Sequence, residues 1–242
     1  AVMLVGVVLR GAALTFRAYD TGAAARRWER IFALASATTP VMLGVCAGAV
    51  SSGEVTVEMD VVTCGFFGPW LAPFPWAVGA LTLALFAFLA AVYLANEVRD
   101  ASLREDFRLR ALWAALALGL TAHLTLWLAK DGAPRVFSGL WSDPASWILQ
   151  GSTAAVSVGA IAALWRRRWR LARLLALSEA VLIVWGWALA QFPYLVFPSH
   201  TIDDSAAPEA TLRPVAIALA LGATLLFPSF YYLLRVFKGA QA

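Results

Sequence analysis

The sequence predicts an all-α polytopic membrane protein, a bundle of about seven transmembrane helices, on three observations. Hydrophobic residues make up 61% of the 242 residues, and the mean hydropathy is +0.74. Soluble domains are about 45–50% apolar, so a single soluble core cannot bury this excess. The apolar residues fall in runs close to the roughly 20 helical residues that cross a bilayer. Eleven tryptophans agree with this class, because Trp concentrates at the headgroup boundary.

The apolar runs are joined by polar segments too short for a soluble domain, so residues 1–242 are predicted to form one integral membrane domain. The predicted helices are residues 1–16, 30–50, 74–95, 109–129, 145–165, 171–192 and 212–236. The first run is short and does not begin with Met, and we expect the sequence to start partway through a helix. Ser142, Asp143 and Pro144 are typical of a helix cap and first turn before the fifth run.

The charged residues predict which connections share a side of the membrane. Sixteen of the 19 lysines and arginines lie in segments 10–30, 99–110, 166–173 and 235–238. The alternate connections hold three cations and eight acids. The positive-inside rule therefore puts the arginine-rich connections and the C-terminus in the cytoplasm. Segment 166–173, flanked by membrane helices, is better suited to anionic lipid than to nucleic acid.

Several kinds of site are not indicated by the sequence. Cys46 and Cys64 are the only cysteines and form no CxxC pair, so neither zinc nor iron–sulfur binding is predicted. The sequence contains no Gly-rich nucleotide motif and no Ser-His-Asp arrangement. We therefore predict no catalytic residue, no metal ligand and no bound cofactor in this chain.

Four stretches resemble subunit II of the cytochrome bd-type quinol oxidases. They are LRGAALTFR at 9–17, RRWERIF at 26–32, the proline-rich turn QFPYLVFPSHTIDDSAAPEATLRP at 191–214, and FPSFYYLLRVFKG at 227–239. The resemblance implies eight transmembrane helices in two four-helix groups, in the bacterial inner (cytoplasmic) membrane. It implies a partner, subunit I, that binds haem b and haem d, oxidises quinol and reduces dioxygen to water. This chain would be a non-haem subunit, not catalytic alone, that supports and shields the partner and lines proton or oxygen access.

Three candidate site residues follow the first run. Arg10 and Arg17 are either interface anchors that fix topology or, for Arg10 above all, a polar entry or subunit contact. The resemblance places Thr15 where the family usually has an acidic residue that is proposed to admit protons. Because Thr15 can pass a hydrogen bond but cannot hold a charge, that proton route is in question.

Two ionisable residues lie inside apolar runs. His123 is near the middle of run 109–129, where it is a hydrogen-bonded packing residue, a proton relay or a haem ligand. Glu179 is about two turns into run 171–192, where it either pairs with Arg173 or another loop arginine, or relays protons.

The proline-rich turn carries the remaining candidates. Asp203 and Asp204, with His200 nearby, either belong to a rigid capped turn or form an outer-face docking element or proton exit. Pro193 and Pro198 are expected to stop the preceding helix and stiffen this turn.

Two other functions stay open from the sequence. A small-solute transporter would need broken helices or a repeat with polar groups at the membrane midplane. A structural membrane subunit of another redox complex would need only the apolar helices and a partner.

Overall fold

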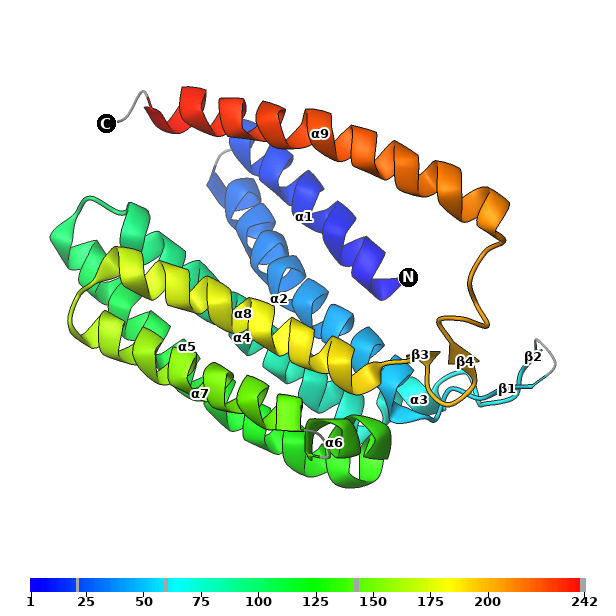
Figure 1. The fold of residues 1–242 in the computed structure, drawn as a ribbon. Helices are drawn as coiled ribbons and strands as arrows, with labels where there is room; N and C mark the ends of the chain where they lie inside the picture. The colour runs from blue at the N-terminus through cyan, green and yellow to red at the C-terminus, as the bar shows by residue number, and fades with distance from the viewer. Residues whose placement is uncertain (21, 59–60, 142–143, 240–242) are drawn as a thin grey trace. The chain divides into compact units, whose positions relative to one another are not determined.

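The computed structural model describes residues 1–20, 22–58, 61–141 and 144–239, and these residues are mainly helical (Figure 1). The long helices are α1 (Val2–Tyr19), α2 (Gly22–Ser52), α4 (Pro73–Glu97), α5 (Ala101–Gly132), α7 (Pro144–Trp165), α8 (Trp169–Gln191) and α9 (Glu209–Gly239). The short helices are α3 (Gly68–Leu71) and α6 (Pro134–Trp141), and the strands are β1 (Val57–Glu58), β2 (Val61–Val62), β3 (Tyr194–Val196) and β4 (His200–Thr201). The predicted cap residues Ser142 and Asp143 lie outside the described residues.

Seven of the described helices are long and apolar enough to cross a membrane. They correspond one for one to the seven predicted runs, which confirms the all-α polytopic class. Helix α2 begins eight residues before the predicted residue 30, and α5 extends past both ends of the predicted 109–129. At the start of α5, Glu105 pairs with Arg108 and Asp106 with Arg110. Such pairs at three- and four-residue spacing stabilise a helix where its residues are charged. Hydropathy alone therefore underestimates the length of α5.

The chain divides into two compact units, Ala1–Thr201 and Ile202–Ala242. The first unit contains α1 to α8 and both small sheets. The second contains α9, a single long helix that includes Pro214 and Pro228.

Within the first unit, α4 is the central helix because it packs against α2, α5 and α8. Its Phe88 and Val92 are fully enclosed, together with Leu164 of α7, in an apolar core that α5 and α8 complete. A second cluster, at the opposite end of these helices, joins Phe74 of α4 to Ala190 of α8 through α5 and α6. Helix α1 packs on α2.

Helices α2 and α4 approach closely where their residues are small. A Cβ added to Gly44 of α2 would lie 2.7 Å from the Gly79 Cα of α4, and one added to Gly48 would lie 2.6 Å from the Pro75 Cα. Membrane helices have no hydrophobic drive to associate within lipid, so close backbone packing of this kind supplies much of their attraction.

Candidate functional site

A buried polar pair joins α7 to α8 within the membrane-spanning region. Glu179 of α8 is 6% exposed, and Ser157 Oγ of α7 donates a hydrogen bond to Glu179 Oε1 at 2.6 Å. Ser157 Oγ also lies 2.9 Å from the carbonyl oxygen of Thr153. A hydroxyl has one hydrogen, so Ser157 can donate to only one of these acceptors at a time.

Arg173, one of the partners expected for Glu179, contacts other residues. Arg173 lies 3.8 Å from Glu97 of α4 and stacks over the Tyr93 ring, with the guanidinium carbon 5.8 Å from its centroid. Glu179 instead bonds a serine, a residue that charge patterning does not single out. A hydroxyl facing a carboxyl on a neighbouring helix depends on helix pairing, which the sequence does not give.

Arg10 and Arg17 of α1 both lie over one aromatic ring of α2. Their guanidinium carbons are 5.7 and 6.0 Å from the centroid of Phe32, within the range of a cation–π contact. Between them, Thr15 Oγ1 donates to the Gly11 carbonyl oxygen at 3.2 Å, and the Thr15 side chain is exposed. Arg10 thus lies near the middle of α1, and Thr15 and Arg17 lie nearer the α1–α2 connection.

The connected ends of α1 and α2 are tied together by Trp28 of α2. Its Nε1 donates to Asp20 Oδ2 at 2.7 Å, and its ring stacks on Phe16 of α1 at 4.9 Å between centroids. Asp20 is therefore the carboxylate that joins α1 to α2, and no pattern in the sequence predicted this role.

His123 is exposed on α5, and its Nδ1 lies 2.7 Å from the carbonyl oxygen of Gly119 one turn earlier. A haem ligand needs a pocket that encloses the macrocycle around the coordinating nitrogen. A side chain exposed on one helix does not make such a pocket, so His123 and the described residues around it do not by themselves fit a haem site.

The proline-rich turn is fastened to the end of α2. Ser199 Oγ donates to the Val55 carbonyl oxygen at 3.3 Å, and the Phe197 amide donates to the Val50 carbonyl oxygen at 3.4 Å. Trp187 Nε1 of α8 donates to Ser51 Oγ at 2.9 Å, and Ser51 is fully buried. Ser199 therefore holds the turn to the segment that follows α2.

Arg135 of α6 fixes the other side of this turn. Its Nη2 donates to the Phe192 carbonyl oxygen at 2.7 Å, and its guanidinium carbon lies 5.6 Å from the Tyr194 ring centroid. The sequence marked Arg135 only as a rare cation among acid-rich connections. A guanidinium group can both donate to carbonyl oxygens and stack on aromatic rings, and Arg135 makes both kinds of contact.

The remaining candidates are divided between the two units. His200 belongs to β4, where it pairs with Val196 of β3. Asp203 and Asp204 are exposed in the second unit, before α9. Among the described residues, no group of three or more His, Cys, Asp or Glu side chains is arranged to hold a metal ion.

Comparison with known proteins identifies the family. A family model described as cytochrome bd terminal oxidase subunit II matches residues 1–237. A comparison with curated protein sequences gave no match. One similar chain occurs in the solved structure of bd oxidase from Geobacillus thermodenitrificans, with 24% sequence identity and a TM-score of 0.79. The match covers 97% of this chain and 71% of that chain, and it shows a shared fold. Because the family model covers nearly the whole sequence, the chain belongs to the cytochrome bd terminal oxidase subunit II family.

Proposed function

We propose that this chain is the non-haem subunit II of a bd-type quinol:oxygen oxidoreductase in a bacterial respiratory chain. It supports a haem-bearing subunit I, which binds haem b and haem d, oxidises quinol and reduces dioxygen to water. The observation that carries the proposal is the family match over residues 1–237, on a fold in which seven described helices are long and apolar enough to cross a membrane.

A supporting role agrees with the chemistry of the side chains. The two histidines, His123 and His200, belong to separate elements, and neither belongs to a described cluster of metal-ligating residues. The helices offer mostly apolar side chains to their surroundings. Such a wall shields a partner's haems from lipid and passes dioxygen, which is itself apolar and enriched in the bilayer.

The chain is proposed to lie in the inner (cytoplasmic) membrane with its C-terminus in the cytoplasm. The arginine-rich connections 99–110 and 166–173 then face the cytoplasm. The turn with His200, Asp203 and Asp204 faces outward, where it is a candidate contact for subunit I.

Proton access is the finer part of the proposal. Thr15 and Arg17 lie near the α1–α2 connection that would face the cytoplasm, Arg10 lies about two turns further along α1, and all three are exposed. They are suited to line an entry that a neighbouring subunit completes. Thr15 would pass a proton through a hydrogen bond rather than store it.

Co-purification tests the proposal. An affinity tag on this chain should recover a second, haem-bearing subunit, with the absorption band of reduced haem d and quinol-dependent oxygen consumption. Recovery of the folded chain with a haem-free partner would point instead to another membrane complex. Solute uptake by the chain alone in liposomes would point to a transporter.

A further inference from the structure

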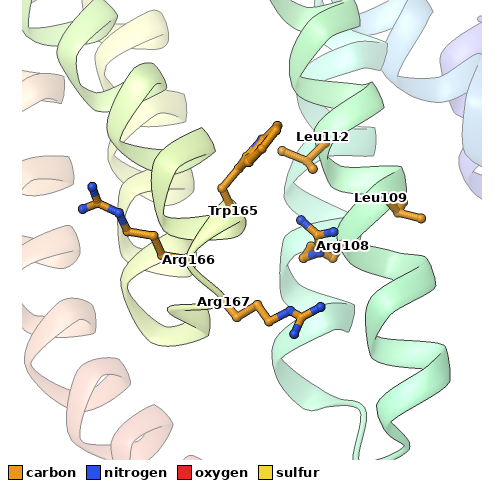
Figure 2. Close-up of a pocket in the computed structure, with 6 residues that line it drawn as sticks. All are labelled: Arg108, Leu109, Leu112, Trp165, Arg166 and Arg167. Atoms are coloured by element: carbon orange, nitrogen blue, oxygen red, sulfur yellow. The ribbon is translucent and has the colours of Figure 1, made fainter.

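An open, cationic cavity lies at the arginine-rich end of the first unit, between α5 and the turn that joins α7 to α8. Its volume is about 440 Å³, and it is lined by Arg108, Leu109 and Leu112 of α5 with Trp165, Arg166 and Arg167 (Figure 2). Trp165 and Leu112 face each other across it, whereas the Arg108 and Arg167 side chains approach each other below them. The Arg166 side chain points away from α5.

The charge at the base of this cavity suits one singly charged anion. Arg108 and Arg167 both pair with Glu105, Arg108 Nε at 2.8 Å from Oε1 and Arg167 Nη2 at 3.5 Å from Oε2. Two guanidinium groups around one carboxylate leave a net charge of about +1. Each guanidinium carries five N–H donors in a planar fork, more than Glu105 uses, so further donors remain to bind a phosphate group.

The backbone at Arg167 indicates that the arginine side chain matters at this position. The Arg168 amide donates to the Ala163 carbonyl oxygen at 2.8 Å and the Arg167 amide to that of Leu164 at 3.2 Å, the bonding pattern of a Schellman turn. In this motif glycine usually occupies the left-handed position, but here Arg167 does so, at φ 55°. A non-glycine residue there lowers the stability of the fold. The presence of arginine instead of glycine therefore suggests that the arginine side chain makes interactions that compensate for this cost.

The upper wall distinguishes a lipid from a free anion. Trp165 is 70% exposed, and with Leu112, which faces it, it presents an apolar surface beside the guanidinium groups (Figure 2). Tryptophan prefers the boundary between headgroups and acyl chains. Free phosphate would gain nothing from this wall, whereas a phospholipid can lay its acyl chain along it.

We propose that this cavity binds one anionic phospholipid, with the phosphodiester between Arg108 and Arg167 and an acyl chain against Trp165 and Leu112. Basic pockets between membrane helices are suited to such headgroups. The inference rests on the membrane-spanning fold and does not depend on the proposed oxidase function.

The test uses the full chain, with any subunits that co-purify, in nanodiscs containing equal amounts of phosphatidylglycerol and phosphatidylcholine. Native mass spectrometry after release from the nanodiscs gives the ratio of the two lipids retained by the protein. We expect phosphatidylglycerol to be retained preferentially. Arg108→Gln and Arg167→Gly should each lower this preference about fivefold, the effect expected of one cation near a membrane surface.

The stability of Arg167→Gly and two further variants separate binding from folding. Arg167→Gly restores the residue that the turn prefers, so it should raise thermal stability while it weakens lipid binding. Glu105→Gln removes the competing carboxylate and should strengthen retention of phosphatidylglycerol. Arg110→Gln is the matched control, because it removes the same charge from the same helix but from a residue paired with Asp106; it should leave the ratio unchanged.

Distinct results would overturn the proposal. Unchanged retention in Arg108→Gln and Arg167→Gly would exclude this cavity as the site. Displacement of the lipid by inorganic phosphate, with no effect of Trp165→Ala, would show a site for a free anion. Loss of a co-purifying subunit with full lipid retention would show that the arginines contact a protein.

Discussion

Ser157 connects the only carboxylate that the sequence places well inside an apolar run to a neighbouring helix. Removing its hydroxyl leaves Glu179, which is 6% exposed, without this donor. We predict that Ser157→Ala lowers the free energy of unfolding by about 1–3 kcal/mol, the typical effect of an unsatisfied buried polar group. Ser178→Ala is the control for denaturation in detergent, since Ser178 is exposed and bonds only its own helix at Leu174.

Glu179 itself is predicted to act in packing. Within the part of the chain that the structure describes, the bonds from Glu179 lead through Ser157 to the Thr153 carbonyl and to no second titratable side chain. Glu179→Gln keeps an acceptor for Ser157. We expect normal assembly and unchanged oxygen consumption per haem in the co-purified complex. Normal assembly with lost oxygen consumption would instead make Glu179 a proton relay.

Asp100 is the cap residue of α5 and lies outside the apolar span. Its Oδ1 accepts from Ser102 Oγ at 2.6 Å and from the Leu103 amide at 2.9 Å, and these bonds lower the pKa of Asp100 below its ordinary value of 3.8. Because the pKa of Asp100 is lower in the folded protein than in the unfolded chain, ionised Asp100 stabilises the fold above pH 3.8. This stabilisation is lost as the pH falls through the pKa of Asp100 in the folded protein. Asp100→Ala should therefore lower the melting temperature at pH 7, with a difference that narrows below pH 3.8.

The neutral cap variant separates the two contributions at Asp100. Asparagine is also a good cap residue, so the melting temperature of Asp100→Asn at pH 7 should be close to that of the original chain. The part of the pH dependence that comes from protonation of Asp100 should be absent in this variant. A pH-independent difference between Asp100→Ala and the original chain would assign the effect to helix propensity.

At the scale of elements, the contact between α2 and α4 depends on the absence of a side chain at Gly44. An added Cβ would lie 2.5 Å from the Val78 carbonyl oxygen and 2.7 Å from Gly79 Cα, so one of the two backbones must move. We predict that Gly44→Ala lowers the free energy of unfolding by about 1–3 kcal/mol, as overpacking of a well-packed contact does.

The control for this prediction is Gly119→Ala in α5, where an added Cβ meets nothing within 4 Å. Alanine favours a helix more than glycine does, so this variant should be neutral or stabilising in the same unfolding measurement. An equal decrease in the free energy of unfolding in both variants would mean that the close contact between α2 and α4 does not cause the destabilisation.

The elements were predictable to the extent that each depends on its own sequence. Apolar length was enough to find all seven spans, because every one must cross the same thickness of hydrocarbon. The short helix α6 was missed, because its eight residues, Pro134–Trp141, fall within a connection. Gly44 and Gly48 form a GxxxG spacing that could have marked the α2 contact face, although the sequence does not name α4 as its partner.

For the whole molecule, hydropathy and charge predicted the class and the order of spans, but not the contacts between them. The link from Trp187 to Ser51 joins residues 136 positions apart. Arg173 pairs with Glu97 rather than with Glu179. Both outcomes depend on which helices pack together, and apolar periodicity specifies a buried face without specifying the helix that covers it.

The arginine distribution makes a prediction about the chain as a whole, namely that the connection at Ala101 and the turn at Ser205 lie on opposite sides of the membrane. Few cations cross a bilayer during insertion, and the arginine-rich connections alternate with acid-rich ones. Ala101→Cys and Ser205→Cys, each in a background with Cys46→Ala and Cys64→Ala, provide single labelling sites at exposed positions. A membrane-impermeant maleimide added to spheroplasts should label position 205 at once and position 101 only after detergent is added. Detergent labelling of both variants is the control for access, and labelling of both positions in intact spheroplasts would overturn the predicted orientation.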